Sequence, residues 1–315
     1  MRKLLLLLKR KDYRSNIANF IKAGLFITPS LQILLLGISK KALEILRLST
    51  QLKIQKKLSK KYSHILQNPP ELTKDKKESN KVWICWLQGI ENAPKLVQVC
   101  YKSVVRNLSD KEVIVVTKDN YSRYTKLPKH ILNKWEKGTI SNTHFSDILR
   151  IELLVRHGGL WLDSTVLCTN STVPKYIEQS DLFLYQVLKP GLDGHSIYVS
   201  SWLIKANSNN KVLGLTRELL FDYWKKKNRL VDYFLLHHFL CISLNTFQDQ
   251  KNKIPKFPNS IPHILLLQLF DNFDSQKYQH IQHLTPFHKL SYKRDTNELA
   301  IKNTFYDILI NQERY

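Results

Sequence analysis

The sequence predicts an α/β fold in which a mixed, mostly parallel sheet of Rossmann type is flanked by helices. Short apolar runs rich in Val, Ile and Trp have the length of buried strands, and segments of helical period separate them. Few hairpin turns join these runs, which favours parallel pairing. A basic helical extension precedes the pattern. The chain has 315 residues, 43% of them hydrophobic, enough for the core of one large domain or two modest ones.

The alternation of strands and helices begins at residue 81. The run KVWICWLQ (81–88) is compact and apolar, which predicts the first buried strand. Pro94 opens a helix with one apolar face that ends near Asn107. EVIVVT (112–117) is the second predicted strand. These elements form one strand–helix–strand unit.

A second unit of the same kind follows. A helix is predicted around 129–137, and Ser141 or Thr143 can cap a longer helix that runs to His157. A Gly-Gly pair ends this helix, and LWLD (160–163) is the third strand. The remaining segments complete the same domain, as strands at 181–187 and 196–206, helices at 209–227, 231–247 and 262–270, and the run TPFHKLSYK at 285–293.

Residues 1–78 form a basic, partly apolar helical region, and the α/β domain spans 79–315. Within this region, 40–61 is a basic helix and 67–80 is a linker with a Pro-Pro pair. Residues 20–38 are nearly long enough to cross a bilayer, but polar residues interrupt them. A membrane span is therefore less favoured than either an interfacial segment on anionic lipid or a helix packed on the main domain.

The formal charge of the chain is +23, and the first 80 residues hold 18 Lys and Arg against 5 Asp and Glu, a net of +13. Such a field favours a polyanionic partner: nucleic acid, an anionic membrane face or phosphorylated substrates. A Lys-rich surface that maintains solubility is the simpler alternative. The sequence shows no nucleic-acid module with basic residues interleaved with aromatic ones, so we expect no nucleic-acid partner.

Several other classes of site lack support in the sequence. The 4 cysteines are far apart and form no C-x-x-C, which predicts buried free thiols in a reducing compartment rather than a zinc site or disulfides. No G-x-x-x-x-G-K-[ST] or G-x-G-x-x-G motif occurs, so ATP or dinucleotide chemistry is not expected.

Three charged residues stand where an α/β sheet binds its ligands. Asp147 and Arg150 are neighbours on one face of a largely apolar predicted helix. Asp163 ends the strand that follows, and ligands bind outside the carboxyl ends of the strands in open α/β sheets. An acid there can hold a divalent cation or a sugar hydroxyl. The structural alternatives are an internal salt bridge between Asp147 and Arg150 and a turn capped by Asp163.

In combination these features resemble the D-x-D nucleotide-sugar glycosyltransferases with the GT-A fold. Residues 81–166 look more closely like the capsular polysaccharide synthesis protein family, which is related to mannosyl- and galactosyltransferase-like sugar-binding transferases. The matching segments are VWICWLQGIENAPKLVQVC, EVIVVTKDNY, KGTISNTHFSDILRIELLVRHGGLWLDSTV, RELLFDYWKKKNRLVDYFLLHHF and TPFHKLSYK, and the resemblance covers about residues 80–293.

The resemblance implies roles for individual residues. Asp147, Arg150 and Asp163 match the polar trio of the family at the sugar-nucleotide site, where they would be catalytic. Trp83 and Gln88 match the first strand and its exit, where such folds seat the nucleobase and ribose of the donor.

A late basic segment completes the implied site. His288 and Lys289 match a segment that closes on the diphosphate in many GT-A enzymes, and His288 would join Asp163 as a ligand of Mn²⁺ or Mg²⁺. Thr165 stands where the second acid of D-x-D is expected. A hydroxyl can reach a metal or a phosphate but carries no charge. The divalent cation is therefore held by Asp163 and His288, held weakly, or replaced by lysine or arginine.

Two further sets of residues have weaker signals. His237 and His238 lie on an apolar predicted helix, where core or rim positions are more common than ligand positions. Ser200, Ser201 and Trp202 on a strand can face the donor sugar or pack within the sheet.

The resemblance implies a nucleotide-sugar-dependent glycosyltransferase of the hexosyltransferase class, acting in capsule or cell-surface polysaccharide synthesis. Its acceptor would be lipid-linked or a polysaccharide, and it would lie in the cytoplasm, peripheral on the inner face of a bacterial cell membrane. The alternatives are a catalytically weak scaffold of the same fold, suggested by the incomplete acid pair, and a basic nucleic-acid-binding protein, suggested by charge alone.

Overall fold

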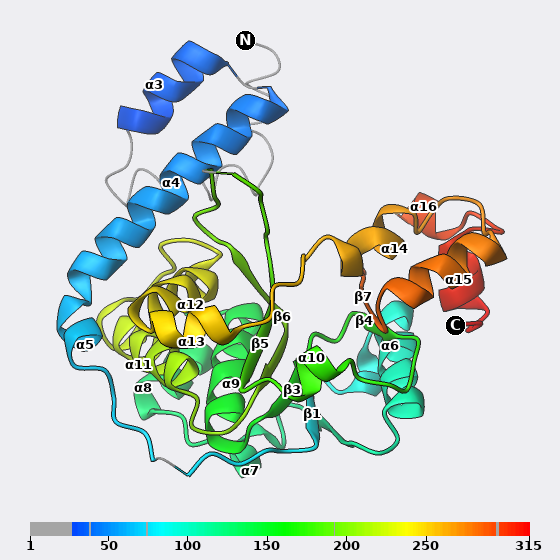
Figure 1. Cartoon of the computed structure of the whole chain (residues 1–315), viewed down its shortest axis with the longest axis horizontal. Coiled ribbons are helices and arrows are strands. Elements are labelled where there is room, and N and C mark those ends of the chain that lie inside the picture. The colour runs from blue at the N-terminus through cyan, green and yellow to red at the C-terminus, as the bar shows by residue number, and fades with distance from the viewer. Residues whose placement is uncertain (1–26, 38, 74, 192, 294–295) are drawn as a thin grey trace.

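The computed structural model describes residues 27–37, 39–73, 75–191, 193–293 and 296–315 (Figure 1). In this part of the chain, 5 strands form a central sheet in the order β2-β1-β3-β6-β5. The strands are β1 (Lys81–Cys85), β2 (Glu112–Val116), β3 (Gly159–Leu162), β5 (Leu182–Gln186) and β6 (Val199–Ala206). β1 pairs in parallel with β2 and β3, whereas β6 is antiparallel to β3 and β5. Only β6 of these strands is reversed, which confirms the mixed, mostly parallel sheet.

The sheet separates two apolar cores. Side chains alternate between the faces of a strand, so Trp83 and Cys85 of β1 lie in one core and Val82 and Ile84 lie in the other. Helices cover both faces in Figure 1, with α9 (Asn142–His157), α11 (Lys211–Lys226) and α12 (Leu235–Thr246) on one side and α6 (Lys95–Asn107) on the other. Burial of β1 on both faces explains why its sequence is a continuous apolar run rather than an alternating one.

The main helices agree with the sequence prediction. They are α6 (Lys95–Asn107), α8 (Lys129–Glu136), α9 (Asn142–His157), α11 (Lys211–Lys226) and α12 (Leu235–Thr246). The hydroxyl of Ser141 accepts a hydrogen bond from the backbone N–H of His144, so Ser141 is the cap of α9. The predicted strand at 81–88 ends earlier, at Cys85, because a turn follows in which the N–H of Gly89 bonds the carbonyl of Trp86.

The helix expected at 262–270 is broken into two pieces. A 3₁₀ turn holds Pro262, and the four-residue α14 follows it. Several short elements and α15 were not predicted. The remaining elements are α5 (Ser63–Gln67), α7 (Tyr121–Tyr124), α10 (Lys175–Glu178), α13 (Gln248–Lys253), α14 (Ile264–Leu267), α15 (Ser275–Leu284), α16 (Thr296–Leu299), 3₁₀ turns at Ile90–Asn92 and Ile261–His263, and a π-helical turn at Asp307–Asn311.

A separate antiparallel pair joins two distant parts of the chain. β4 (Val166–Cys168) pairs with β7 (Phe287–Lys289), and the register places Val166 opposite Lys289 and Leu167 opposite His288. β4 begins three residues after Asp163. This pairing therefore carries the late basic segment to the carboxyl end of β3.

The N-terminal helices form an arm at one side of the molecule (Figure 1). The arm consists of α3 (Ile27–Leu36) and α4 (Lys40–Lys61), joined by a hydrogen bond of 2.8 Å from the Ser49 hydroxyl to the Gln32 side-chain oxygen. Ile54 and Leu58 of α4 are buried in the same core as Trp83, and each contributes roughly 1.5–3 kcal/mol by burial. The second half of α4 is thus part of the main core.

The linker that follows the arm runs along the main domain. The N–H of Lys77 donates to the Ser208 hydroxyl at 3.0 Å, and the N–H of Ser208 donates to the carbonyl of Lys77 at 3.1 Å. Of the predicted interfacial segment 20–38, residues 20–26 and 38 lie outside the described residues. Within the described ranges, no helix combines the length and the apolar character that crossing a bilayer requires.

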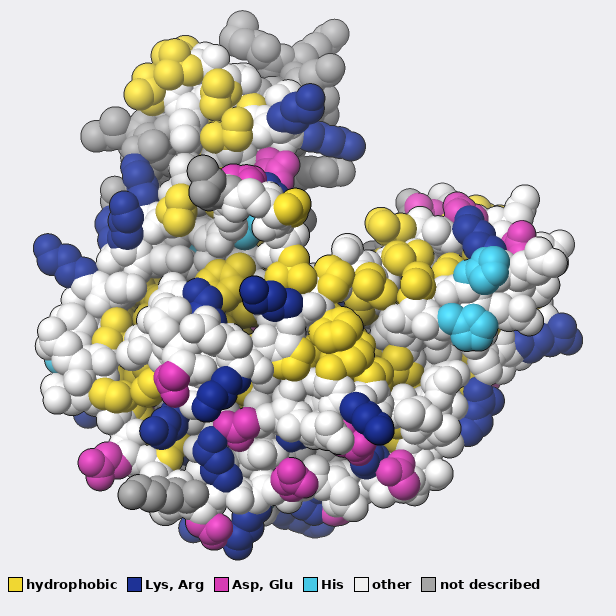
Figure 2. All heavy atoms as spheres, in the orientation of Figure 1, with side chains coloured by type: hydrophobic (Ala, Val, Ile, Leu, Met, Phe, Trp, Pro, Cys, Tyr) yellow, Lys and Arg dark blue, Asp and Glu magenta, His cyan; other side chains and the backbone are white. Residues whose placement is uncertain are grey.

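The outer surface of α3 is apolar. Leu34 and Leu35 expose 81% and 71% of their surface. Figure 2 shows a gathering of hydrophobic side chains over this helix, with Lys and Arg side chains beside it. The arm therefore presents an apolar surface next to a basic one.

Candidate functional site

A Gly-Gly pair delivers the central acid of the site. Gly158 and Gly159 have φ angles of 66° and 101°, in the left-handed region that favours glycine. A Cβ atom on Gly159 would lie 2.4 Å from the backbone oxygen of Lys81, so only glycine allows β3 to approach β1 here. The strand then runs straight to Asp163 at the carboxyl edge of the sheet, as the sequence predicts.

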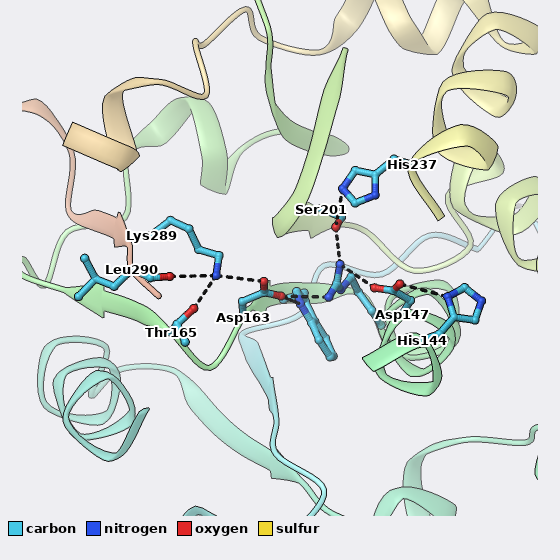
Figure 3. A network of polar contacts seen from close by, with 10 residues as sticks. His144, Asp147, Asp163, Thr165, Ser201, His237, Lys289 and Leu290 are labelled. Atoms are coloured by element: carbon cyan, nitrogen blue, oxygen red, sulfur yellow. Dashed lines mark hydrogen bonds and ion pairs between the residues drawn. The ribbon is translucent and has the colours of Figure 1, made fainter. Parts of the chain in front are cut away.

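The carboxylate of Asp163 lies between two cations (Figure 3). Its Oδ1 atom accepts hydrogen bonds from the Arg150 guanidinium at 3.0 Å and from the indole N–H of Trp161 at 3.1 Å. Its Oδ2 atom lies 3.5 Å from the ammonium nitrogen of Lys289. Asp163 is therefore part of an ion-pair chain and does more than cap a turn.

Arg150 connects Asp163 to the helix α9. Its Nη1 atom lies 3.4 Å from Asp147 and donates to the hydroxyl of Ser201 on β6 at 2.5 Å. The guanidinium carbon stands over the Trp161 ring, 4.8 Å from the ring centroid. The Arg150 side chain is only 7% exposed, so its direction is held by contacts from several elements. The salt bridge between Asp147 and Arg150 exists, but it extends into a larger network.

The far end of the network contains two histidines. The Nδ1 atom of His144 lies 3.3 Å from Asp147. Burial raises the pKa of Asp147, but the Arg150 charge and the His144 hydrogen bond outweigh it, so that pKa is lowered. His237 bonds the Ser201 hydroxyl at 3.1 Å, and burial lowers the pKa of His237 to about 4. His237 is thus a neutral partner of Ser201 at neutral pH.

Lys289 closes the other end of the network. Its ammonium group donates to the hydroxyl of Thr165 and to the backbone carbonyl of Leu290 at 3.3 Å. Since Thr165 holds the position of the missing second acid, this lysine contacts both residues of the D-x-T sequence. The structure thus brings together Asp147, Arg150, Asp163, Thr165 and Lys289.

His288 lies on the opposite side of β7 from Lys289. Its side chain is fully buried, and its Nε2 atom lies 3.1 Å from the hydroxyl of Thr169. Burial lowers the pKa of His288 to about 4. Neighbouring residues of a strand point to opposite faces, so the pairing that delivers Lys289 to Asp163 turns His288 away from it.

Trp83 and Gln88 are not part of this network. Trp83 is fully buried, and its indole N–H donates to the carbonyl of Gly158 at 2.9 Å. Gln88 lies in a hollow of about 570 Å³ at the carboxyl ends of β1 and β2, which Thr117, Asp119 and Asn120 also line. Trp83 therefore supports the Gly-Gly turn, whereas Gln88 faces open space at the same edge of the sheet as Asp163.

The polar groups fit a divalent cation poorly. Both oxygens of Asp163 face cations, and the Thr165 hydroxyl contacts Lys289. Within the described residues, no group of three or more His, Cys, Asp and Glu side chains could hold a metal ion. Mg²⁺ and Mn²⁺ require several oxygen ligands at about 2.0–2.2 Å. Here the carboxylate of Asp163 already contacts the positively charged groups of Arg150 and Lys289.

Some members of the network had weak signals or none in the sequence. Trp161 is apolar and on a buried strand, where packing is its ordinary role. Ser201 and His237 belong to β6 and α12, and their contact joins residues 36 positions apart. The signal in the sequence that could have identified them is that both are polar residues on elements that are otherwise apolar and buried.

One comparison with known proteins identifies a family. A family model described as capsular polysaccharide synthesis protein matches residues 37–309. This match includes α4, whereas the resemblance noted from the sequence covered only about residues 80–293.

Individual proteins are more distant. A protein of Aspergillus fumigatus named glycosyltransferase afumC is 30% identical over 105 residues, which are 30% of this chain and 26% of that protein. The chain thus spans about a quarter of the length of this relative. A solved structure named PaToxG glycosyltransferase is 14% identical, with a TM-score of 0.37, over 83% of this chain and 97% of that one.

Proposed function

The chain belongs to the capsular polysaccharide synthesis protein family, and we propose that it is a glycosyltransferase with a GT-A-type arrangement. It transfers a hexose from a nucleotide-sugar to a lipid-linked or saccharide acceptor in the synthesis of capsule or another cell-surface polysaccharide. The name of the Aspergillus relative, a glycosyltransferase, supports the activity. The observation that carries the proposal is the carboxylate of Asp163 held between Arg150 and Lys289 at the carboxyl end of β3.

This arrangement suits the departure of a nucleoside diphosphate. Sugar transfer breaks the bond to the diphosphate, and negative charge develops on its oxygen. Cations that are fixed before the reaction stabilise such charge without reorganisation. Arg150 is locked by Asp147 and Ser201, and Lys289 is positioned by Thr165 and Leu290. Asp163 orients both cations and offers an oxygen to a sugar hydroxyl.

The donor nucleoside has a place beside this cluster. The hollow that Gln88 lines lies at the carboxyl ends of β1 and β2, and β1 is the direct neighbour of β3. Adjacent strands lie about 4.8 Å apart, so a nucleotide-sugar can extend across the strand ends from the hollow to Asp163. We assign the nucleoside to the hollow and the diphosphate to the Arg150–Lys289 pair.

The arm gives the enzyme a route to a lipid-linked acceptor. The exposed leucines of α3 lie next to α4, and residues 27–61 contain 8 Lys and Arg against 1 Glu. Apolar side chains flanked by lysine suit the interface of an anionic bilayer. The proposal therefore includes docking of the arm on the cytoplasmic face of the cell membrane.

Nucleotide binding and Asp163→Asn test the proposal. UDP or GDP should stabilise the protein in a thermal-shift assay, by about 2.7 kcal/mol at a ligand concentration of 100 times Kd. Asp163→Asn should lower sugar transfer or donor hydrolysis by about 10²-fold, because the two cations lose the charge that orients them.

The control variant is Asp110→Asn. Asp110 is an exposed acid that precedes β2, at the amino end of that strand and away from the carboxyl ends that hold Asp163. This variant should keep full activity. Circular dichroism should show both variants folded. The proposal would be refuted if no nucleotide-sugar and no nucleoside diphosphate of a panel stabilised the protein. Full biological function in a folded Asp163→Asn variant would favour the scaffold alternative.

A further inference from the structure

We infer that the ammonium group of Lys289 takes the place of the divalent cation in this site, so that the donor diphosphate binds without metal. The inference rests on the proposed function, since it assigns how the same site holds its donor. It concerns three groups: the carboxylate of Asp163, the hydroxyl of Thr165 and the ammonium of Lys289.

The first step is the state of Asp163. A carboxylate that holds Mn²⁺ or Mg²⁺ directs an oxygen at the ion from about 2.0–2.2 Å. Here Oδ1 accepts two hydrogen bonds and Oδ2 faces an ammonium group. A doubly charged ion at Oδ2 would stand beside Lys289 and close to Arg150, where repulsion between like charges disfavours it.

The second step is the lack of suitable partners for a metal at this position. Thr165 carries no charge, and its hydroxyl is bound by Lys289. Asp147 already contacts Arg150 and His144. His288, the expected second ligand, lies on the other side of β7 and bonds Thr169. The described residues thus supply Asp163 with cations rather than with further ligands.

The third step is the freedom of Lys289 to bind an anion. An ammonium group has three donors, of which Thr165 and the Leu290 carbonyl take two. The distance of 3.5 Å to Asp163 exceeds the usual range for a hydrogen bond. The Lys289 side chain is 20% exposed, so its third donor can turn to a phosphate oxygen. The register of β4 and β7 holds it at this point.

Binding of UDP and GDP to the full chain tests this inference directly. Isothermal titration in EDTA and in Mn²⁺ should give Kd values that agree within about twofold. Lys289→Met should raise Kd at least tenfold in both buffers, equivalent to about 1.4 kcal/mol. Lys277→Met, which removes a partly exposed lysine on α15, should leave Kd unchanged.

One double variant reverses the design. Thr165→Asp combined with Lys289→Ala puts a second carboxylate near Asp163 and removes the competing cation. This protein should bind Mn²⁺ itself, seen by loss of the free-ion electron paramagnetic resonance signal, and should need Mn²⁺ to bind UDP or GDP. The wild type should leave that signal unchanged.

The outcomes separate the two proposals. Binding of UDP or GDP that disappears in EDTA, or direct Mn²⁺ binding by the wild type that Asp163→Asn abolishes, would overturn the role of Lys289 and leave the glycosyltransferase proposal standing. An unchanged Kd in Lys289→Met would also overturn that role. Failure of the wild type to bind any nucleoside diphosphate, with or without Mn²⁺, would overturn both.

Discussion

Charge pairing at the level of single residues explains why so many ionisable groups can lie in one small site. Arg150 contacts Asp147, Asp163 and Ser201 and lies over an aromatic ring. Removal of one partner from a buried ion pair leaves an uncompensated charge, which is more destabilising than the absence of the whole pair. The network therefore acts as a structural unit in which each charge depends on its partners.

The buried histidines make stability depend on pH. Burial lowers the pKa of His288 and of His237 to about 4, whereas both rings titrate near 6.5 when unfolded. Between these values the unfolded state binds more protons, so stability is complete above pH 6.5 and falls as pH decreases toward 4. Asp147, with a lowered pKa, contributes in a separate window below its unfolded value of about 3.9.

Urea unfolding of wild type and His288→Gln between pH 4 and 7 measures this effect. Each histidine adds up to about 1.4 kcal/mol per pH unit to the slope in that window. His288→Gln keeps a polar group near Thr169 but cannot be protonated, so its slope should be smaller by up to one proton. Parallel curves for the two proteins would contradict the assignment.

One turn and one strand pairing matter most at the level of elements. The Gly-Gly turn sets the direction of β3, and the β4–β7 pairing brings the late basic segment to its end. The turn is held by Trp83, whose indole bonds the carbonyl of Gly158. Trp83, which the resemblance assigned to the nucleobase region, is thus buried in the core with its indole N–H on the Gly-Gly turn.

Gly159→Ala should destabilise the protein by more than the roughly 1–3 kcal/mol of a strained φ angle alone, because the new Cβ also meets the backbone of Lys81. Gly138→Ala is the matched control. Gly138 has a φ angle of 71°, but a Cβ there would meet nothing within 4 Å. Chemical denaturation should rank Gly159→Ala well below Gly138→Ala in stability, and equal losses would show that the close approach of β3 to β1 is unimportant.

Across the whole molecule, a hollow lies between the arm and the C-terminal segment. Figure 2 shows the surface hollowed between the arm and the segment that contains α14–α16, with hydrophobic side chains along it. The buried half of α4 attaches the arm to the main core. Docking of the arm on a membrane would thus fix the position of the main domain relative to the lipid surface.

Liposome sedimentation tests the docking. Leu34→Ser with Leu35→Ser should reduce binding to vesicles of phosphatidylglycerol and phosphatidylcholine by at least tenfold, because two exposed leucines are lost from the interface. Salt should weaken binding of the wild type, since lysine contacts to the lipid are screened. Leu267→Ser, at a leucine that is 80% exposed on α14, should bind as wild type does. Equal binding by all three proteins would rule out α3 as the docking surface.

The sequence by itself determined most elements of the fold and the centre of the site. Apolar periodicity and capping residues are local signals, so α4, α6, α9 and the strands β1, β2 and β3 follow from short windows of sequence. The placement of Asp163 after a Gly-Gly turn is local in the same way. Asp147 and Arg150 follow from helical spacing. The metal site and the membrane partner stay predictions.

Only the tertiary structure decided which distant residues join that centre. The basic segment was recognised, but the sequence did not determine whether His288 or Lys289 faces Asp163. A shift of one residue in register exchanges the faces of a strand, and the register of β4 against β7 depends on contacts more than 100 positions apart. The same holds for Ser201 and His237, whose contact requires β6 and α12 to pack together. Long-range register and packing thus decided that a lysine, and not a histidine, stands beside the acid.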